Sequence, residues 1–341
     1  MTTPQRVLLV GGSGFMGRYV AEALLAAGHS VAVLARGERE PPPGVELLRG
    51  ARDDAASLEQ ALAGRRFDLT VDFLAFDAID VERLLLLPHA ALGRYVMISS
   101  GQVYLVARGS TAPYAEDEAE REAIPEPPAE TRDHLQWSYG IGKRRAEHVL
   151  LGLRGSHGVR AVALRLPIVQ GNGDGSLRLW AWLQRMLDGG PVLVPDGARL
   201  SRHVWAGDVA RAVVWLAEHD APRHTFYNLA QPELVPLREL LERIARAAGL
   251  SPVFVDVTYE EMEAAGIDGD AVPWAGRWAS VPDPARVINE WHLNPTPLAE
   301  YLPDVVRWHL EHRPTASHLG YVYREAEIAF ARQRGVPATR G

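Results

Sequence analysis

The chain has 341 residues, of which 47% are hydrophobic and 23% are charged, proportions that are ordinary for a globular protein. It contains no cysteine, which excludes disulfides, thiolate metal ligands and thiol nucleophiles. Its formal net charge is −7, and an acidic chain of this kind is not expected to coat nucleic acid or an anionic membrane. The length allows one large domain or two smaller ones, each with its own core.

The N-terminal residues, "MTTPQRVLLVGG", run almost at once into an apolar strand pattern. They lack the basic region, apolar region and cleavage site of a signal peptide. Apolar runs elsewhere are shorter than the roughly 18 residues that a membrane span requires. We therefore expect a cytoplasmic protein with no membrane partner, and the absence of cysteine fits that reducing compartment.

Short apolar runs alternate with helical patterns through the first half of the chain. Strands are predicted at 6–10, 31–35, 45–48, 69–74, 94–99 and 161–166, with helices at 15–27, 57–63 and 79–87. The strands are continuous Val, Leu and Ile runs, which suit strands covered on both faces. This alternation predicts an α/β protein with a Rossmann-type, doubly wound parallel sheet.

Two changes of pattern divide the chain. Residues 105–136 are acidic and proline-rich, which predicts a surface excursion. Beyond residue 170 the pattern is mixed, with helices expected at 177–188, 208–218, 236–248 and 297–311 and a strand at 225–230. We assign 1–170 with 207–230 to a dinucleotide-binding domain, and 171–206 with 231–341 to a smaller α/β substrate-binding region.

A glycine-rich turn connects the first predicted strand to its helix. It carries Gly11, Gly14 and Gly17 in "LLVGGSGFMGRYVAEALL". A helix N-terminus offers unpaired N–H groups and a partial positive charge to a pyrophosphate. A glycine triplet between the first strand and its helix is the context that the dinucleotide fingerprint requires. We assign Phe15 and Met16 of the same turn to the cofactor site as well.

The end of the second strand bears on the choice of cofactor. An acid at this place binds the adenosine ribose 2′-hydroxyl of NAD, whereas a nearby arginine accommodates the 2′-phosphate of NADP. Here Ala35 is followed by Arg36, so we favour NADP. Glu38 lies close enough along the chain to keep NAD as the alternative.

Tyr139 and Lys143 are four positions apart, so on a helix they share one face. A phenol ordinarily has a pKa of about 10, and a neighbouring ammonium lowers this pKa by stabilising the phenolate. Such a tyrosine could exchange a proton with an alcohol or carbonyl oxygen while a nicotinamide exchanges a hydride at carbon. The lysine can also hold the nicotinamide ribose. The spacing alone is equally typical of two residues on an ordinary helix face.

A third polar group is expected at the end of the strand in "MISSGQVY", residues 97–104. The carboxyl edge of an open α/β sheet is where ligands bind. Ser100 is the better candidate to fix a substrate oxygen, and Ser99 is the alternative.

Five segments in order, "GGSGFMG", "ISSGQVY", "YGIGK", "LRLPIVQG" and "RHVWAGDVA", resemble the extended short-chain dehydrogenase/reductases. This is the NAD-dependent epimerase/dehydratase family, and the resemblance covers about residues 5–230. It implies that Tyr139 is the acid/base, that Lys143 is its partner and that Ser100 donates a hydroxyl. It also implies that Pro167 lies beside the nicotinamide carboxamide.

The resemblance places Arg202 and His203 in the substrate region, with Asp208 as the cap of the following helix. We add two further substrate-binding candidates, Gln102 and Trp137. The remaining cofactor-binding candidates are Asp53, Leu74 and Ala75.

Two departures from the family pattern bear on activity. Ala51 stands where the family often has an aspartate that contacts adenine, and Asp53 is the nearby substitute. Ile168 stands where sugar-nucleotide epimerases usually carry an asparagine that helps to hold the nucleotide diphosphate. Arg36 and the missing asparagine at position 168 favour a ketoreductase-like enzyme that acts on a sugar-like or other small polyhydroxylated substrate.

Alternatives remain open. A sugar-nucleotide epimerase or dehydratase with a recycled cofactor would use the same residues. Residues 271–282 resemble a branch of the family that includes chloroplast stem-loop RNA-binding proteins, which suggests a non-catalytic RNA binder. The Ser100, Tyr139 and Lys143 set and the acidic charge count against that function. We expect no metal, although "WHLEH" places two histidines on one helix face. The family commonly forms homodimers.

Overall fold

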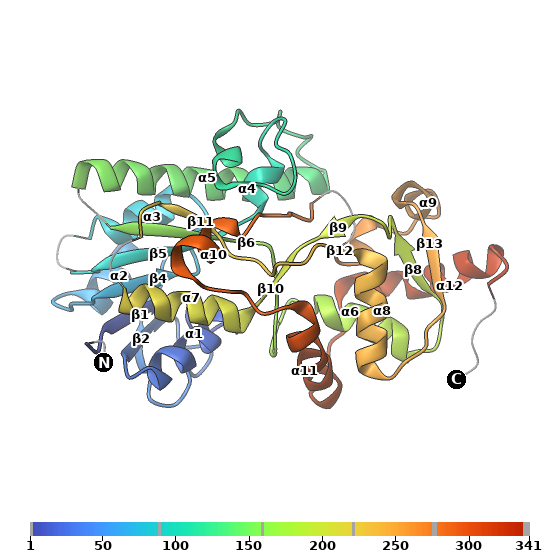
Figure 1. Ribbon diagram of the computed structural model, residues 1–341, viewed down its shortest axis with the longest axis horizontal. Helices are drawn as coiled ribbons and strands as arrows, with labels where there is room; N and C mark the ends of the chain where they lie inside the picture. The colour runs from blue at the N-terminus through green and yellow to red at the C-terminus, as the bar shows by residue number, and fades with distance from the viewer. Residues whose placement is uncertain (1–2, 88–89, 158–159, 220–221, 275–277, 337–341) are drawn as a thin grey trace. The chain divides into compact units, whose positions relative to one another are not determined.

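The computed structural model describes residues 3–87, 90–157, 160–219, 222–274 and 278–336 and contains a sheet of seven parallel strands (Figure 1). The strands are β1 (Arg6–Val10), β2 (Ser30–Ala35), β3 (Glu46–Arg49), β4 (Leu69–Asp72), β5 (Arg94–Ser100), β6 (Ala161–Leu166) and β11 (Phe226–Asn228). Their order is β11-β6-β5-β4-β1-β2-β3, and all neighbours are parallel. The predicted doubly wound fold is confirmed. The order reverses between β1 and β4, where such sheets bind ligands.

Helices cover both faces of this sheet, as the continuous apolar strands require. On one face, α1 (Phe15–Ala26) packs against α7 (Ala206–Glu218). On the other face, α3 (Ala78–Leu85) packs against α5 (Arg132–His157) (Figure 1). The same part of the chain contains α2 (Ala55–Leu62), α4 (Gln102–Leu105), the 3₁₀ turn η1 (Glu116–Glu120) and α10 (Ala285–Trp291).

The chain divides into two units, and the first comprises Met1–Pro167, Val204–Ala230 and Pro282–Pro295. The segment 282–295 belongs with this unit because it is bound to β11. The Asn228 amide donates to the Asp283 carbonyl at 3.0 Å, and Arg286 donates to the Phe226 carbonyl at 2.9 Å. The sequence pattern placed this segment with the C-terminal region. Its attachment to β11 depends on hydrogen bonds from side chains to backbone carbonyls, and such bonds produce no periodic pattern in the sequence.

The second unit comprises Ile168–His203, Gln231–Val281 and Thr296–Gly341. Its helices are α6 (Arg178–Leu187), α8 (Leu237–Ala248), α9 (Tyr259–Ala264), α11 (Leu298–Glu311) and α12 (Arg324–Gln333), with 3₁₀ turns η2 (Gly269–Ala271) and η3 (Leu319–Tyr323). Its strands are β8 (Val192–Pro195), β9 (Leu200–Ser201), β12 (Val235–Pro236) and β13 (Phe254–Val257). The chain passes between the units at β7 (Ile168–Gln170) and β10 (His203–Trp205). Residues 275–277 of the 271–282 segment lie outside the described residues.

Ion pairs hold the C-terminal helix of this second unit in place. Arg185 and Glu327 are both fully buried, and their side chains approach to 2.6 Å. Arg324, at the start of α12, pairs with Asp188 at 2.6 Å. Among the described residues, no helix is both long and apolar enough to cross a membrane.

Two local expectations were wrong. Asp208 is not the cap of its helix, because α7 begins one turn earlier with Trp205 in the cap position. Asp208 instead lies buried in the first turn, paired with Arg211. The acidic segment 105–136 is not wholly a surface excursion, since the Glu116 side chain is only 5% exposed. Its carboxylate accepts a hydrogen bond from the Asn228 backbone N–H at 3.0 Å.

Two glycines let α5 lie close to the loops at the carboxyl edge of the sheet. A Cβ on Gly142 would lie 2.5 Å from the Phe76 carbonyl oxygen, and one on Gly140 would lie 3.0 Å from the Gln102 carbonyl oxygen. Both residues fall within "YGIGK", between Tyr139 and Lys143. The motif therefore also fixes where the helix sits against the ends of β4 and β5.

We predict that Gly142→Ala lowers the free energy of unfolding by about 1–3 kcal/mol, because the added methyl group meets backbone that cannot move aside cheaply. Gly152→Ala is the matched control in the same helix, where no atom lies within 4 Å of the added Cβ. That change should raise the free energy of unfolding by about 0.5–1 kcal/mol through helix propensity. Urea denaturation measures both, and equal effects would contradict the packing argument.

Candidate functional site

A pocket of about 530 Å³ opens at the carboxyl ends of β1, β2 and β3 and at the loop after β4. Its lining residues are Val10, Gly11, Ser13, Gly14, Leu34, Ala35, Arg36, Gly37, Glu38, Arg39, Gly50, Arg52, Asp53, Leu74, Phe76 and Asp80. This is the edge at which the strand order reverses, the place where doubly wound sheets take dinucleotides.

The glycine-rich turn after β1 lines part of this pocket. Gly11 adopts a φ of +79°, which favours glycine, and its N–H donates to the Leu34 carbonyl at 3.0 Å. A Cβ on Gly17 would overlap the backbone of Gly12, so only glycine lets α1 begin so close to the turn. Gly14 is the N-cap and has no side-chain cap, which leaves the N–H groups of the first turn for an anion. The turn fits a pyrophosphate.

Five of the eleven predicted cofactor residues line this pocket. They are Gly11, Gly14, Arg36, Asp53 and Leu74. The first turn of α1 holds Phe15, Met16 and Gly17. Pro167 follows β6 at the end of the first unit and is buried.

The other lining residues were not predicted as cofactor residues, and five of them, Ser13, Arg39, Arg52, Phe76 and Asp80, bring side chains that could contact a ligand. Ser13 lies inside the quoted glycine motif and could have been included with it. Arg39, Arg52 and Phe76 sit in loops and Asp80 in the first turn of α3, and the positions of all four depend on contacts between distant segments.

A buried carboxylate organises one side of the pocket. Asp72 ends β4 and is fully buried. It accepts hydrogen bonds from the Tyr95 hydroxyl at 2.6 Å and from the Leu74 N–H at 2.8 Å. Arg52 pairs with it at 2.7 Å. Burial and the Asp72 charge raise the pKa of Tyr95 well above its ordinary value, so this phenol stays protonated. Asp72 thereby fixes the loop that carries Leu74, Ala75 and Phe76.

Tyr139 and Lys143 differ sharply in exposure. Tyr139 is 39% exposed, whereas Lys143 is 2% exposed. The Lys143 ammonium donates to the carbonyls of Ala75 at 2.7 Å and Ile98 at 2.9 Å. Its Nζ lies 5.8 Å from the centre of the Tyr139 ring and 4.8 Å from the centre of the Phe76 ring. The lysine is thus a buried cation beneath an exposed phenol.

Burial lowers the pKa of Lys143 from 10.5 to about 8, and the charges of Asp72 and Glu147 oppose part of this shift. The ammonium is therefore charged at neutral pH but loses its proton more readily than an exposed lysine does. A cation at this place favours the phenolate form of a nearby tyrosine.

The two neighbouring serines have different environments. Ser99 is buried, and its hydroxyl donates to Glu147 at 2.6 Å. Ser100 ends β5, is partly exposed, and its Oγ accepts from the Gln102 N–H at 3.2 Å. Ser100 is therefore the serine that a ligand can reach. Gln102 itself is only 6% exposed, and its amide points towards Gln136.

Trp137 does not share the helix face of Tyr139. Positions two apart on an α-helix are separated by about 200° around its axis. The Trp137 indole N–H donates to the Ile124 carbonyl at 3.2 Å, which turns the ring towards the 105–136 segment.

The other two predicted substrate residues belong to the second unit. His203 is fully buried, with Nδ1 3.0 Å from the Gln170 amide nitrogen and Nε2 3.0 Å from the Ser201 hydroxyl. Burial lowers the pKa of His203 to about 3, so the ring is neutral. Arg202 is 6% exposed and donates to the Pro232 carbonyl at 3.1 Å. Both side chains are thus engaged by their own unit.

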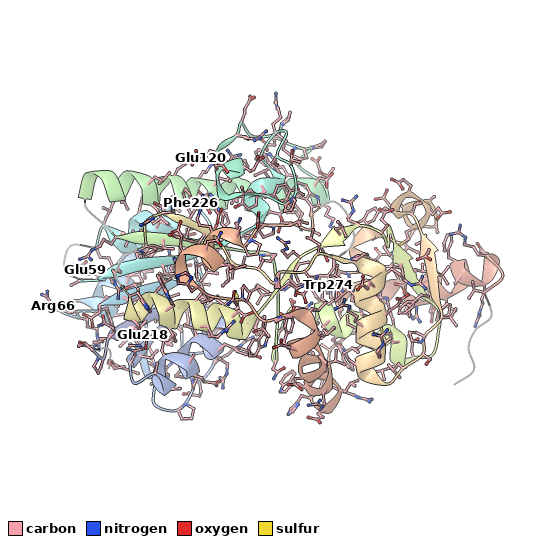
Figure 2. The ribbon with its side chains drawn as sticks, viewed as in Figure 1. Glu59, Arg66, Glu120, Glu218, Phe226 and Trp274 are labelled. Atoms are coloured by element: carbon pink, nitrogen blue, oxygen red, sulfur yellow. The ribbon has the colours of Figure 1, made fainter. Side chains whose placement is uncertain are left out.

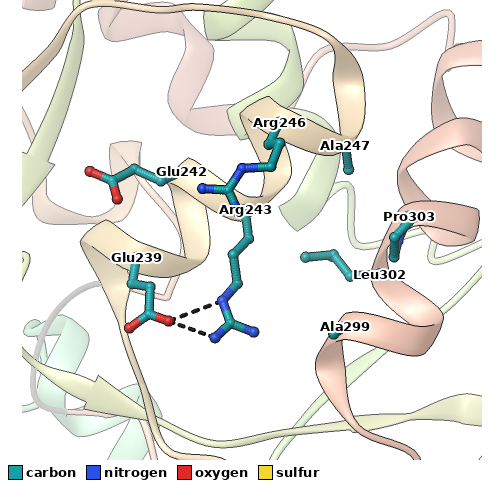
Figure 3. A pocket seen from close by; sticks show the side chains of 8 residues that line it. All are labelled: Glu239, Glu242, Arg243, Arg246, Ala247, Ala299, Leu302 and Pro303. Atoms are coloured by element: carbon teal, nitrogen blue, oxygen red, sulfur yellow. Dashed lines mark hydrogen bonds and ion pairs between the residues drawn. The ribbon is translucent and has the colours of Figure 1, made fainter.

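A second pocket, of about 390 Å³, lies between α8 and α11 of the second unit (Figure 3). Its lining residues are Glu239, Glu242, Arg243, Arg246, Ala247, Ala299, Leu302 and Pro303. Arg243 donates to Glu239 through two nitrogens, at 3.0 and 2.6 Å. None of the predicted site residues lines this pocket. Among the described residues there is also no group of three or more acids or histidines that could hold a metal ion.

Comparison with known proteins identifies the family. The model of the NAD dependent epimerase/dehydratase family matches residues 7–230. A 2′-dehydrokanamycin reductase of Streptomyces kanamyceticus is 31% identical over 289 residues, which cover 82% of this chain and 76% of that protein. The chain belongs to the NAD-dependent epimerase/dehydratase family.

More distant relatives and solved structures extend this result. The chloroplast stem-loop binding protein of 41 kDa b from Arabidopsis thaliana is 24% identical, over 73% of this chain and 64% of that protein. A UDP-glucose 4-epimerase structure from Thermotoga maritima has a TM-score of 0.70 at 18% identity, covering 91% of this chain and 100% of that one. A dTDP-glucose 4,6-dehydratase from Bacillus anthracis, in complex with NAD, has a TM-score of 0.69 at 18% identity, covering 90% and 96%. At these identities the two structures show a shared fold.

The lowered pKa of Lys143 predicts a specific pH dependence of stability. From pH about 8 up to the ordinary lysine value of 10.5, the unfolded chain binds more protons than the folded chain. Below this window the ammonium is charged in both states, so the full cost of burying it lowers the free energy of unfolding. As pH rises through the window, the buried lysine loses its proton first and this cost disappears. The free energy of unfolding should therefore gain up to about 1.4 kcal/mol per pH unit from this group.

Urea unfolding of the ligand-free protein, repeated across that window, measures this contribution. Lys143→Met is the reference variant, because it keeps the length of the side chain and removes its titration. The difference in the free energy of unfolding, wild type minus variant, should increase with pH. A difference independent of pH would show that the ammonium is not destabilised by burial.

Proposed function

We propose that this protein is a ketoreductase that uses NADPH to reduce a ketone on a sugar-like or other small polyhydroxylated substrate to a secondary alcohol. Membership of an enzyme family of nicotinamide-dependent oxidoreductases and epimerases supports the general chemistry. The observation that carries the proposal is the exposed Tyr139 phenol one helical turn above the buried Lys143 ammonium.

Each of the three polar residues has a defined task in this proposal. Ser100, partly exposed at the end of β5, donates a hydrogen bond from its hydroxyl to the substrate carbonyl oxygen and orients it, keeping its proton. Tyr139 gives its phenolic proton to that oxygen as the carbonyl π electrons move onto it. Lys143 stabilises the phenolate that remains, which solvent then reprotonates. General acid catalysis of this kind contributes typically ~10²–10⁴-fold to the rate.

The bound nicotinamide would supply the hydride that the carbonyl carbon accepts. Residues of the first unit fit its dinucleotide: the glycine turn suits the pyrophosphate, and the pocket beyond Arg36 suits the adenosine half. Lys143 has two of its three protons committed to the carbonyls of Ala75 and Ile98. The third is available to a ribose hydroxyl.

Net reduction is favoured over a recycled cofactor by two observations. The 31% identical relative carries the name of a reductase. Ile168 occupies the position at which sugar-nucleotide epimerases usually have asparagine, as the family resemblance implies. NADPH is favoured over NADH because the tip of β2 carries Arg36 and Arg39, and because the Glu38 carboxylate is paired with Arg36 at 3.1 Å. A paired acid is a weaker acceptor for ribose hydroxyls.

Tyr139→Phe should reduce kcat by about 10²–10⁴-fold, because the phenyl ring cannot donate a proton. The dissociation constant for the cofactor should change little, since the pocket described above does not include Tyr139. Steady-state kinetics on a panel of sugar ketones, together with fluorescence titration of the nucleotide, measures both. Turnover close to the wild-type rate in this variant would rule out Tyr139 as the acid.

The purified wild-type protein should bind NADPH at least about tenfold more tightly than NADH, a difference equivalent to about 1.4 kcal/mol. Calorimetric titration of nucleotide-free protein gives both dissociation constants. Mass spectrometry of the protein as purified is the companion measurement. NAD that stays bound through dialysis would favour the epimerase or dehydratase alternative.

A further inference from the structure

The adenosine end of the pocket is surrounded by more positive charge than the second strand alone supplies. Arg36 and Arg39 follow β2 and line the pocket. Arg49, the last residue of β3, lies opposite Ala35 in the parallel register of β2 and β3. All three arginines are exposed. Arg36 is paired with a carboxylate, whereas the side chains of Arg39 and Arg49 form no ion pair or hydrogen bond within the part of the chain that the structure describes. The Arg49 guanidinium is in addition packed against Gly37, a residue of the pocket lining.

Arg36, the residue to which sequence patterns point, already has a partner. Its Nε lies 3.1 Å from Glu38 Oε1, and its Nη2 lies 3.4 Å from Glu38 Oε2. Both side chains are about two-thirds exposed or more, at 71% and 68%. An incoming phosphate dianion would compete with this carboxylate and would also face its negative charge, so Arg36 is a screened cation.

Arg49 has neither limitation. Among the described residues its side chain forms no ion pair and no hydrogen bond. Its guanidinium lies so close to the backbone of Gly37 that a Cβ on Gly37 would overlap the terminal nitrogen Nη1 of Arg49. Gly37 adopts a φ of +86°, the left-handed region that favours glycine. Glycine is therefore needed there twice, once for the turn and once to leave room for the Arg49 guanidinium. Arg49 itself does not line the pocket, but it packs directly against Gly37, which does.

We propose that Arg49 is the residue that selects the 2′-phosphate of NADPH, reaching it across Gly37, while the Arg36–Glu38 pair contributes less. The inference rests on the proposed NADPH preference and names the group responsible for it. A guanidinium presents planar, paired donors that match a phosphate dianion, and an unpaired one loses no existing partner on binding. The two flanking residues of Gly37 then form the rim of the phosphate site and Arg49 forms its base.

Arg49→Gln tests this assignment, with Arg36→Gln in parallel. Arg66→Gln is the matched control, because it removes the same charge from an exposed arginine that precedes β4 at the amino edge of the sheet (Figure 2). Calorimetric titration with NADPH and with NADH gives the ratio of the two dissociation constants for each variant. Adenosine 2′-monophosphate and adenosine 5′-monophosphate serve as fragment probes that do not depend on turnover.

The expected result is a loss of at least about tenfold in the preference for NADPH in Arg49→Gln, with NADH binding unchanged and little effect in Arg66→Gln. Arg49→Lys should keep an intermediate preference, because it retains the charge and loses the planar fork. Gly37→Ala should reproduce the loss by displacing the guanidinium.

Two outcomes would overturn the inference, and they are distinguishable. If Arg36→Gln abolishes the preference and Arg49→Gln leaves it intact, the 2′-phosphate is held by Arg36, and the proposed function stands. If the wild-type protein binds NADH as tightly as NADPH, the NADPH preference itself fails, and with it the selective role of Arg49.

Discussion

The arrangement of the candidate site depends on one buried cation, the Lys143 ammonium. Its two hydrogen bonds join α5 to the end of β4 through Ala75 and to β5 through Ile98. Because an unpaired buried ammonium is very costly, these carbonyls must stay in place for the folded state to persist. The helix, the loop after β4 and the strand that ends in Ser100 are therefore positioned together. Tyr139 acquires its place from the same constraint, one turn along the helix.

A second buried charged residue, Glu147, lies on the same helix as Lys143. Glu147 follows Lys143 by one helical turn, is nearly fully buried, and pairs with Arg165 of β6 at 2.8 Å. It also accepts the Ser99 hydroxyl. The helix face that carries Tyr139 and Lys143 thus continues into the core, where Glu147 and Arg165 form an ion pair. Removing one partner of such a pair would leave an uncompensated buried charge, a change that typically costs ~3–5 kcal/mol. Strand, helix and serine turn are held in register by polar contacts as much as by apolar packing.

The sequence predicts the sheet and the glycine turn because both leave local signals. Strands covered on two faces are continuous apolar runs, and a turn before a helix shows its glycines in order. The packing role of Gly140 and Gly142 is different, since it depends on the backbone of Phe76 and Gln102, far away in the chain. The role of Arg52 could not be predicted from the sequence for the same reason, because its acidic partners, Asp72 and Asp80, lie some twenty residues or more further along the chain. Trp137 shows the converse case: it is two positions from Tyr139 in the sequence, but its indole points to the Ile124 carbonyl from another face of the helix.

The pocket also shows why a single residue at the tip of β2 is a weak basis for cofactor choice. Acids and bases alternate around it, with Glu38 beside Arg36 and with Asp72 and Asp80 beside Arg52. Their fields largely cancel beyond a Debye length, which is about 8 Å at physiological ionic strength. A chain with a net charge of −7 gains little long-range attraction for an anionic nucleotide. Discrimination must then come from direct contact with a cation that no carboxylate already occupies. That condition depends on which side chains meet across neighbouring strands, and so on the folded register of β2 and β3.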